Sequence, residues 1–296
     1  MSAKSYFHLA GVIPVAGQLL DFQMEWSDCM MPLAPNYTAV ERSVIECAYA
    51  GCETIWIVAN DDVAPLLRHR VGEFVQDPVA FGSQQGRNSS LSQKRIPIFY
   101  VPLNIKDHGK RDCLAWSVIH GSLTAFRIGS NLSKWMAPDR YYVSFPFGVY
   151  NPEVVRDSRK IISSNTPFAL SHEDLTVADG KYLGFTFGKE DFLEFRREIR
   201  KGTGMYTSEN LKDGKYPTTK LPPEKRYSAR YFDLAKVFKH VILKEIKEVP
   251  WYYAIDNWEG YCNFLGSPDR LKIERPPNYL LNYREWNLMG VDDDER

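Results

Sequence analysis

The sequence lacks a surplus of charge of either sign. Its 296 residues include 37 Lys plus Arg and 37 Asp plus Glu, so the formal net charge is +0. Proteins that bind nucleic acid or anionic lipid usually carry a basic surplus. The balance therefore argues against nucleic acid as the main partner. No apolar run approaches the ~20 residues of a membrane-spanning helix, and the N-terminus lacks the basic and long apolar regions of a signal peptide.

The sequence also lacks the spacings of the commonest covalent and metal sites. Its five cysteines are an odd number and include no CxxC pair, and no histidine cluster of zinc-site spacing accompanies them. No Ser-His-Asp or Cys-His arrangement suggests a covalent nucleophile. We therefore expect reduced, mostly buried thiols and a cytoplasmic protein. The cysteines are Cys29, Cys47, Cys52, Cys113 and Cys262.

The first third of the chain has the pattern of a parallel α/β sheet. A short apolar run at 7–16 and a β-branched run at 54–59 predict buried strands. Between them, Thr38 and Glu41 have the spacing of a capping box, which predicts a helix over 38–50. A second helix is expected at 63–74. This alternation predicts a Rossmann-like, mostly parallel, doubly wound sheet flanked by helices.

The rest of the chain continues this alternation less regularly, and we expect one domain over 1–296. Polar, Ser- and Gly-rich stretches at 82–95 and 202–228 predict surface loops. Further strands are expected at 96–103, 140–145, 182–187 and 251–255, and further helices at 112–128, 152–161, 189–200, 231–246 and 257–265.

The turn after the first strand is the strongest candidate for a binding site. Val15 and Ala16 end the apolar run, and Gly17 and Gln18 follow it. A glycine lets the backbone turn sharply and approach a ligand closely. In an open parallel sheet, ligands bind at the carboxyl ends of the strands, where this turn lies. The alternative interpretation is that Gly17 only ends the strand.

Several segments resemble the sugar-1-phosphate nucleotidyltransferases, the nucleotide-sugar pyrophosphorylase family. Residues 13–17 (IPVAG) and 30–33 (MMPL) resemble its first strand, loop and following segment, 109–114 (GKRDCL) its base-reading loop, and 251–256 (WYYAID) a late strand ending in a metal-binding Asp. The resemblance implies the nucleotide-diphospho-sugar transferase fold, with a nucleotide-binding half at 1–150 and an acceptor or sugar half and tail at 151–296. It also implies that Val15, Ala16, Gly17, Gln18, Gly109, Lys110 and Asp112 bind a nucleoside triphosphate or NDP-sugar, with Mg²⁺ at Asp256.

The sequence departs from this family where the chemistry is done. Asp21 stands where the family has a phosphate-binding Arg, Asp28 where it has a Lys, and 145–148 (FPFG) provides no metal-binding Asp at the end of the central strand. Fixed cations are a large source of stabilisation in phosphate chemistry. We expect Asp28 and Asp256 to hold Mg²⁺ instead, and Arg111 to supply positive charge, which makes Asp28 and Arg111 the predicted catalytic residues.

Simpler structural roles remain open for the same carboxylates. Asp21 and Asp28 could be solvated or could cap local turns, and Asp256 could cap the helix that follows it. If these carboxylates are instead functional, we expect the protein to transfer a nucleotidyl group to a sugar phosphate.

The sections 56–70, 96–116 and 135–152 are similar to uncharacterised proteins of T4-like marine phages that are described as nucleotidyltransferases. That likeness implies a phage protein in an infected bacterial cytoplasm. A catalytically degenerate phage structural or assembly module on the same fold, with phage protein partners, is therefore the alternative to an enzyme.

Overall fold

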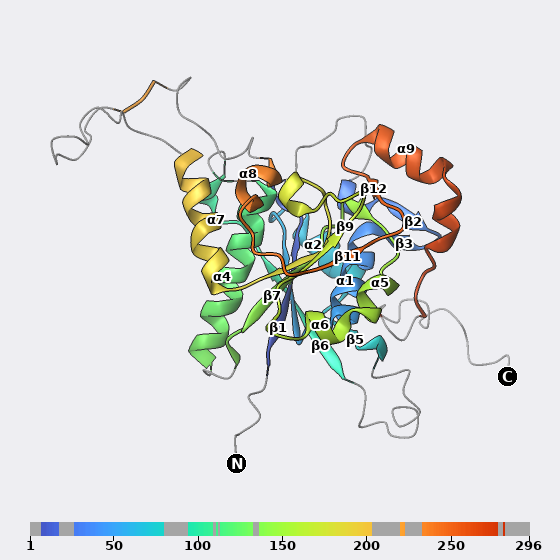
Figure 1. Ribbon diagram of the computed structural model, residues 1–296, viewed down its shortest axis with the longest axis horizontal. Coiled ribbons are helices and arrows are strands. Elements are labelled where there is room, and N and C mark those ends of the chain that lie inside the picture. The colour runs from blue at the N-terminus through green and yellow to red at the C-terminus, as the bar shows by residue number, and fades with distance from the viewer. Residues whose placement is uncertain are drawn as a thin grey trace, which may run out of the picture.

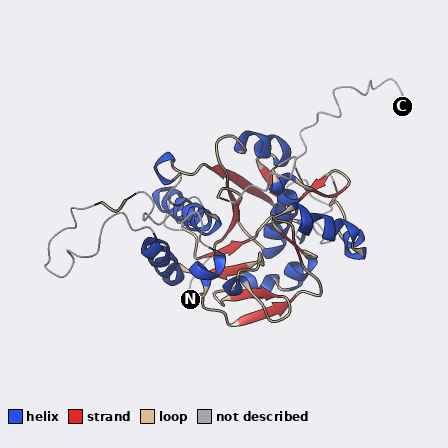
Figure 2. Ribbon diagram, turned by 90° about the horizontal axis from the view of Figure 1, so that it is seen from above, coloured by secondary structure: helices blue, strands red, loops and turns tan. Residues whose placement is uncertain are grey.

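The central feature of the fold is an eight-stranded sheet with helices on both sides, seen in the computed structural model (Figure 1, Figure 2). The structure describes residues 7–17, 27–79, 94–108, 111, 113–132, 136–202, 220–222, 233–277 and 281. The strands of the sheet are β1 (Leu9–Pro14), β4 (Thr54–Val58), β5 (Phe74–Gln76), β6 (Arg95–Val101), β7 (Arg140–Val143), β9 (Phe168–Ser171), β10 (Phe185–Phe187) and β11 (Glu245–Glu248). The helices are α1 (Ala39–Ala50), α2 (Ala64–Val71), α4 (Leu114–Leu132), α5 (Glu153–Asp157), α6 (Arg159–Ile162), α7 (Lys189–Gly202), α8 (Leu234–Phe238) and α9 (Trp258–Gly266).

The strand order is β11-β9-β10-β7-β1-β4-β6-β5, and most neighbours are parallel. β1 pairs in parallel with β4 and β7, β4 with β6, and β9 with β11, whereas β10 and β5 run antiparallel to their neighbours. The mostly parallel α/β sheet predicted from the sequence is confirmed. In Figure 1, β1 leads upward from the N-terminus at the bottom, so the carboxyl ends of the parallel strands lie toward the top.

β1 is apolar at every position because both of its faces are covered. A Cβ atom at Gly11 would lie 2.9 Å from the Cys47 sulfur of α1, so only glycine lets that helix approach so closely. On the opposite face, a Cβ at Gly121 of α4 would lie 3.1 Å from a methyl of Val12. Neighbouring residues of a strand point to opposite faces, and the two helices therefore cover both sides of β1.

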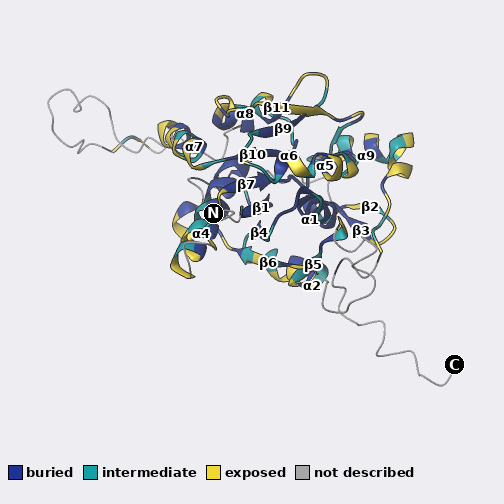
Figure 3. Cartoon of the chain, turned by 60° about the horizontal axis from the view of Figure 1, so that its bottom comes forward, coloured by how far each residue is buried: buried dark blue, intermediate teal, exposed yellow. Residues whose placement is uncertain are grey.

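The helix predicted over 38–50 forms as α1, and its capping box is present. The Thr38 amide and hydroxyl both donate to Glu41 at 2.7 and 2.8 Å. Gly51 ends the helix in the left-handed conformation, with φ +88°. α1 is buried almost all round, as its dark blue colour in Figure 3 shows, so it also carries the charged residues Arg42 and Glu46 into the interior.

Two predicted helices are wrong over part of their length. A helix was predicted at 231–246, and the structure describes this stretch from residue 233 onward. Its only helix there is the short α8. The end of the stretch belongs to β11, whose four residues are all exposed at the sheet edge. The apolar spacing of this stretch suits a helix, but β9 needs a hydrogen-bonding neighbour, and such tertiary pairing overrides local preference. Likewise α2 ends at Val71, and Phe74 begins β5. Strand β9 was not predicted.

Two short strand pairs complete the carboxyl edge of the sheet. β8 (Gly148–Val149) pairs antiparallel with β12 (Tyr253–Ala254), and β2 (Pro32–Ala34) pairs with β3 (Tyr37–Thr38). β12 thereby brings a late part of the chain beside the segment that follows β7.

No helix in the described part of the chain is long and apolar enough to cross a membrane.

Candidate functional site

The turn after β1 lies at the carboxyl edge and needs its glycine. Gly17 has φ +86°, a conformation that side-chain-bearing residues rarely adopt. The amides of Val15 and Ala16 both donate to the carbonyl of Val58, at 2.9 and 2.8 Å. Those two amides are therefore engaged within the sheet, and a phosphate at this turn would need other donors. Ser117 of α4 donates to the Ala16 carbonyl and joins α4 to the turn.

Asp28 lies in the short 3₁₀ helix η1 (Asp28–Met30) and is buried, with 7% of its surface exposed. Its Oδ1 accepts the Cys29 amide at 2.9 Å, whereas Oδ2 is buried and has no hydrogen-bond partner within the described structure. Burial, together with the negative charge of Asp256, raises the pKa of Asp28 to about 7. Asp28 is therefore not a solvated surface carboxylate.

Asp256 follows β12 and lies beside the segment after β7, because the Ile255 amide donates to the Phe147 carbonyl at 2.8 Å. Its Oδ2 accepts the Tyr182 hydroxyl at 2.9 Å and its Oδ1 accepts the Asn257 side-chain amide at 3.0 Å. Helix α9 is capped by Asn257, whose Oδ1 accepts the Gly260 amide at 2.8 Å. The capping role that the sequence left open for Asp256 thus belongs to its neighbour.

The negative charge of Asp256 contributes to the raised pKa of Asp28, so the Asp28 carboxyl lies within electrostatic reach of Asp256. Carboxylate oxygens suit Mg²⁺, which proteins commonly bind through one or two carboxylates, with water and substrate phosphates completing the coordination. The partnerless Oδ2 of Asp28 is available for such a contact. Within the described residues there is no group of three or more His, Cys, Asp or Glu side chains that could hold a metal. These two carboxylates therefore fit a Mg²⁺ ion whose other ligands are water and substrate phosphates, rather than an ion held by protein side chains alone.

Arg111 lies after the carboxyl end of β6, two strands from β1. Its guanidinium lies 3.8 Å from Asp107 and 5.1 Å from the centre of the Trp116 ring, and its side chain is 37% exposed. In the strand order, β1 and β4 lie between β7 and β6. Neighbouring strands are about 4.8 Å apart, so the ends of β6 and β7 are about 14 Å apart along the edge. The predicted nucleotide-binding residues Gln18, Gly109, Lys110 and Asp112, together with Asp21, lie outside the described residues.

Three further polar groups at this edge were not singled out from the sequence. Asn60 follows β4, Ser144 follows β7 and Trp116 is near the start of α4. The Asn60 Oδ1, Ser144 Oγ and Trp116 Nε1 atoms are all buried without a hydrogen-bond partner in the part of the chain that the structure describes. Buried polar atoms are rarely left in this state, and a bound ion, water or ligand is a common reason for the exceptions. The only sequence signal for Asn60 and Ser144 is a polar residue shortly after a buried strand, which is common in α/β proteins.

A fully buried charge network supports the segment after β7. Arg42 donates to Glu46 at 2.8 Å and to the Phe145 carbonyl at 3.0 Å, and the hydroxyls of Tyr142 and Tyr150 donate to Glu46 at 2.6 and 2.7 Å. Phe145 and Phe147 are fully buried, and both rings contact Tyr182. Phe145 and Phe147 therefore pack into the interior, and the segment at 145–148 provides no carboxylate of its own.

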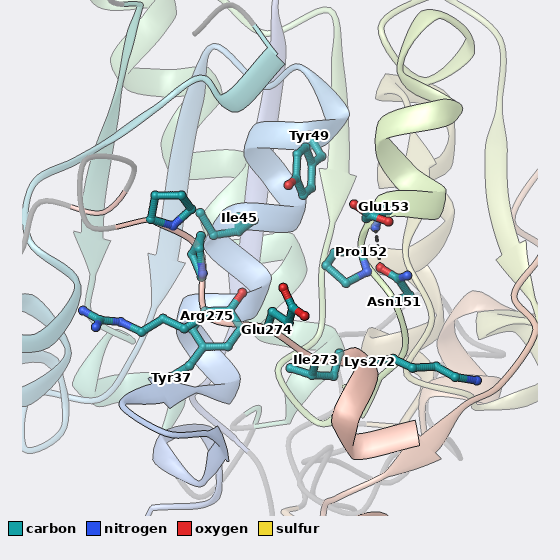
Figure 4. A pocket seen from close by; sticks show the side chains of 12 residues that line it. Tyr37, Ile45, Tyr49, Asn151, Pro152, Glu153, Lys272, Ile273, Glu274 and Arg275 are labelled. Carbon is teal, nitrogen blue, oxygen red and sulfur yellow. Dashed lines mark hydrogen bonds between the residues drawn. The ribbon is translucent and has the colours of Figure 1, made fainter. Parts of the chain in front are cut away.

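A cavity of about 370 Å³ lies on another side of α1, between α1, the start of α5 and the segment after α9 (Figure 4). Tyr49 and Ile45 project from α1, and the side chains of Lys272 and Arg275 extend in opposite directions away from its middle. None of the predicted site residues lines it. It is therefore separate from the carboxyl-edge site.

Solved structures resemble this chain over most of its length, although no protein-family model and no curated protein sequence matches it. A protein provisionally described as a glucose-1-phosphate thymidylyltransferase from Bacillus anthracis, in complex with sucrose, is similar with a TM-score of 0.51 and 8% identity, over 92% of this chain and 98% of that one. UDP-glucose pyrophosphorylase is similar in its apo form, with TM-score 0.49 and 12% identity over 90% and 100% of the two chains. Its complex with UDP-glucose gives a TM-score of 0.47 at 12% identity, over 88% and 97%.

The first of these likenesses extends over nearly the whole of both chains, and its low identity limits it to architecture. The chain therefore has the mixed α/β fold of the nucleotide-diphospho-sugar transferases.

Proposed function

We propose that this protein is a nucleotidyltransferase-like protein that binds a nucleoside triphosphate or an NDP-sugar at the carboxyl edge of its sheet. The observation that carries the proposal is the buried, partnerless carboxylate oxygen of Asp28, which lies at this edge within electrostatic reach of Asp256. The partnerless atoms of Asn60, Ser144 and Trp116 belong to the same edge. A polar ligand there would satisfy groups that the described protein leaves unsatisfied.

The arrangement along the edge suits an extended ligand that contains phosphates. Arg111 and Trp116 lie beyond the end of β6, and Asp256 lies beside the segment that follows β7. We assign the nucleotide to the half of the chain at 1–150 and the sugar to the half at 151–296. Gly17 permits close approach of the backbone at the turn after β1, which lies between the ends of β6 and β7 in the sheet.

The proposed reaction is attack of a sugar phosphate oxygen on the α-phosphorus of a nucleoside triphosphate. A new P–O bond forms to the sugar phosphate, the bond between the α- and β-phosphates breaks, and pyrophosphate leaves. Mg²⁺ held by Asp28 and Asp256 would supply charge stabilisation for the phosphate oxygens. Tyr182 holds the Asp256 carboxylate in place, and Arg111 supplies positive charge near the nucleotide.

A catalytically degenerate binding module on the same fold is the second candidate. It is favoured by the apolar end of β7, where Phe145 and Phe147 are fully buried and no carboxylate is present. Such a module, for instance one used in phage assembly, would bind the nucleotide without turning it over. Turnover therefore separates the two candidates.

The test is isothermal titration of the protein with the common nucleoside triphosphates and with UDP-glucose, in the presence of MgCl₂ and of EDTA. We expect saturable binding of at least one ligand that depends on Mg²⁺. Loss of one charged contact typically weakens an interaction by about tenfold or more. We therefore expect Asp28→Asn and Asp256→Asn each to weaken the Mg²⁺-dependent binding by at least that factor.

The matched control is Asp174→Asn, which makes the same chemical change at an exposed residue in a turn. We expect this control to bind as the wild type does. If no nucleotide or NDP-sugar binds the folded wild-type protein, the proposed function is wrong. If binding occurs but pyrophosphate is not released with any sugar phosphate, the binding module is the better description.

A further inference from the structure

A second cavity, of about 610 Å³, lies at the opposite edge of the sheet, where the parallel strands begin. We call it the amino-edge pocket. Its walls come from the residues before β1, β7, β9 and β11 and from the first turn of α7, which follows the antiparallel strand β10. Cavities of 300–1,000 Å³ are typical of small-molecule sites. The carboxyl-edge residues of the proposed function do not line it.

The pocket contains a buried cation without an ionic partner. Arg140, at the start of β7, is only 7% exposed. Its guanidinium donates to the neutral acceptors Asn165 O at 3.0 Å and Thr186 Oγ1 at 3.5 Å, and its Nε is buried without a partner. No carboxylate of the described residues lies within ion-pair distance of it. Burial accordingly lowers the pKa of Arg140, although Asp191 and Glu190 act in the opposite direction.

The acidic side chains that line the pocket already have hydrogen-bond donors or lie at its exposed rim. Asp191 accepts the Gly188 amide at 3.0 Å and the Ile242 amide at 3.5 Å. Asp139 accepts the His8 amide at 2.8 Å, and Glu190 is exposed. The guanidinium differs from these groups because its acceptors within the described structure are uncharged.

Two further sources of positive potential surround this guanidinium. α7 has 14 residues and begins at the pocket, and the amides and dipole of a helix N-terminus attract anions, although Glu190 and Asp191 in this first turn offset part of that potential. Lys189 and Lys244 stand at the rim and are exposed. Beside the guanidinium there is open space, because a Cβ atom at Gly188 would have Arg140 Nη1, at 3.9 Å, as its nearest neighbour.

We propose that the amino-edge pocket binds a small molecule through a phosphate group, which contacts Arg140 and the first turn of α7. A phosphate oxyanion matches the planar donor fork of a guanidinium and the amides of a helix N-terminus. The remaining volume accommodates the organic part of a phosphate ester. This site is on the opposite edge of the sheet from the proposed nucleotide site and does not depend on it.

The test is a calorimetric titration of the full-length protein with inorganic phosphate at low salt. Gly188→Leu would place a side chain in the open space next to Arg140, and Gly188→Ser is the matched control, because serine is small and is favoured at a helix N-cap. We expect wild type and Gly188→Ser to bind phosphate within about twofold of each other. Gly188→Leu should bind at least about tenfold more weakly, the usual effect of losing a charged hydrogen bond.

Circular dichroism melting establishes whether each variant folds. If Gly188→Leu does not fold, Lys244→Glu at the exposed rim replaces it, and phosphate affinity should fall by about threefold or more through charge reversal. Absence of saturable phosphate binding to the wild type overturns the proposal. The proposal is also overturned if folded Gly188→Leu binds phosphate as the wild type does. The same holds for Lys244→Glu where it replaces Gly188→Leu.

Discussion

The buried carboxyl of Asp28 makes the stability of the protein depend on pH in a definite direction. Burial raises its folded-state pKa from 3.8 to about 7. Between these two values the folded protein keeps a proton that the unfolded chain has lost, so the free energy of unfolding falls as pH rises. Below about pH 4 both states are protonated and Asp28 has no effect. Each pKa unit corresponds to about 1.36 kcal/mol, and the expected loss by pH 8 is about 4 kcal/mol.

The assay is urea denaturation of wild type and Asp28→Asn at several pH values between about 4 and 8, without divalent cations. The free energy of unfolding of Asp28→Asn, minus that of wild type, should grow by about 4 kcal/mol over this range. Any cost of the amide itself is the same at every pH and cancels from the trend. Asp174→Asn, at an exposed position, should give a flat difference. A flat difference for Asp28→Asn would refute the assignment of a raised pKa to this residue.

The same reasoning predicts how Mg²⁺ should act if the proposed site is correct. Mg²⁺ requires the ionised carboxylate, so its binding competes with the proton on Asp28. With a pKa of about 7, the ionised fraction rises about tenfold between pH 6 and pH 8, and Mg²⁺ affinity should rise by about the same factor. An affinity that is equal at both pH values would mean that Asp28 is not a ligand.

Three other substitutions probe the structure around the site. Gly148→Ala should destabilise the protein by about 1–3 kcal/mol in urea denaturation, because its Cβ would lie 2.0 Å from the Tyr182 carbonyl, while Gly266→Ala, with no atom within 4 Å, should be close to neutral. Arg42→Met should cost about 3–5 kcal/mol in the same assay, because it leaves the buried carboxylate of its partner uncompensated; a cost below about 1 kcal/mol would contradict this. Tyr182→Phe removes the hydroxyl donor to Asp256, and Mg²⁺ affinity measured by calorimetry should change severalfold, whereas unchanged affinity would separate Asp256 from the metal.

The first third of the fold could be predicted from the sequence because its signals are local. The capping box of Thr38 and Glu41 and the terminal Gly51 define α1, and continuous apolar runs define β1 and β4. The stretch at 231–248 could not be predicted in the same way. β11 is an exposed edge strand with one apolar residue in four, and only its pairing with β9 makes it a strand.

The candidate site could be predicted in part. Asp28 and Asp256 were proposed from residue type and from a family resemblance, but their mutual approach depends on the pairing of β12 with β8. Asn60 and Ser144 were missed, because a polar residue after a strand is ordinary in sequence and becomes conspicuous only when its buried atom has no partner. That property belongs to the packed molecule.

The pairing of β12 with β8 also has a consequence for how the protein is made. Asp28 is translated early, whereas Asp256, which follows β12, leaves the ribosome only after the strands of the eight-stranded sheet. Tyr261, in the next helix, donates to the Pro32 carbonyl at 2.8 Å and fastens this late segment beside η1 and β2. A nascent or truncated chain that ends before these residues would have much of the sheet but only one of the two carboxylates. The proposed Mg²⁺ and nucleotide site would therefore form only after the segment at 251–261 has docked.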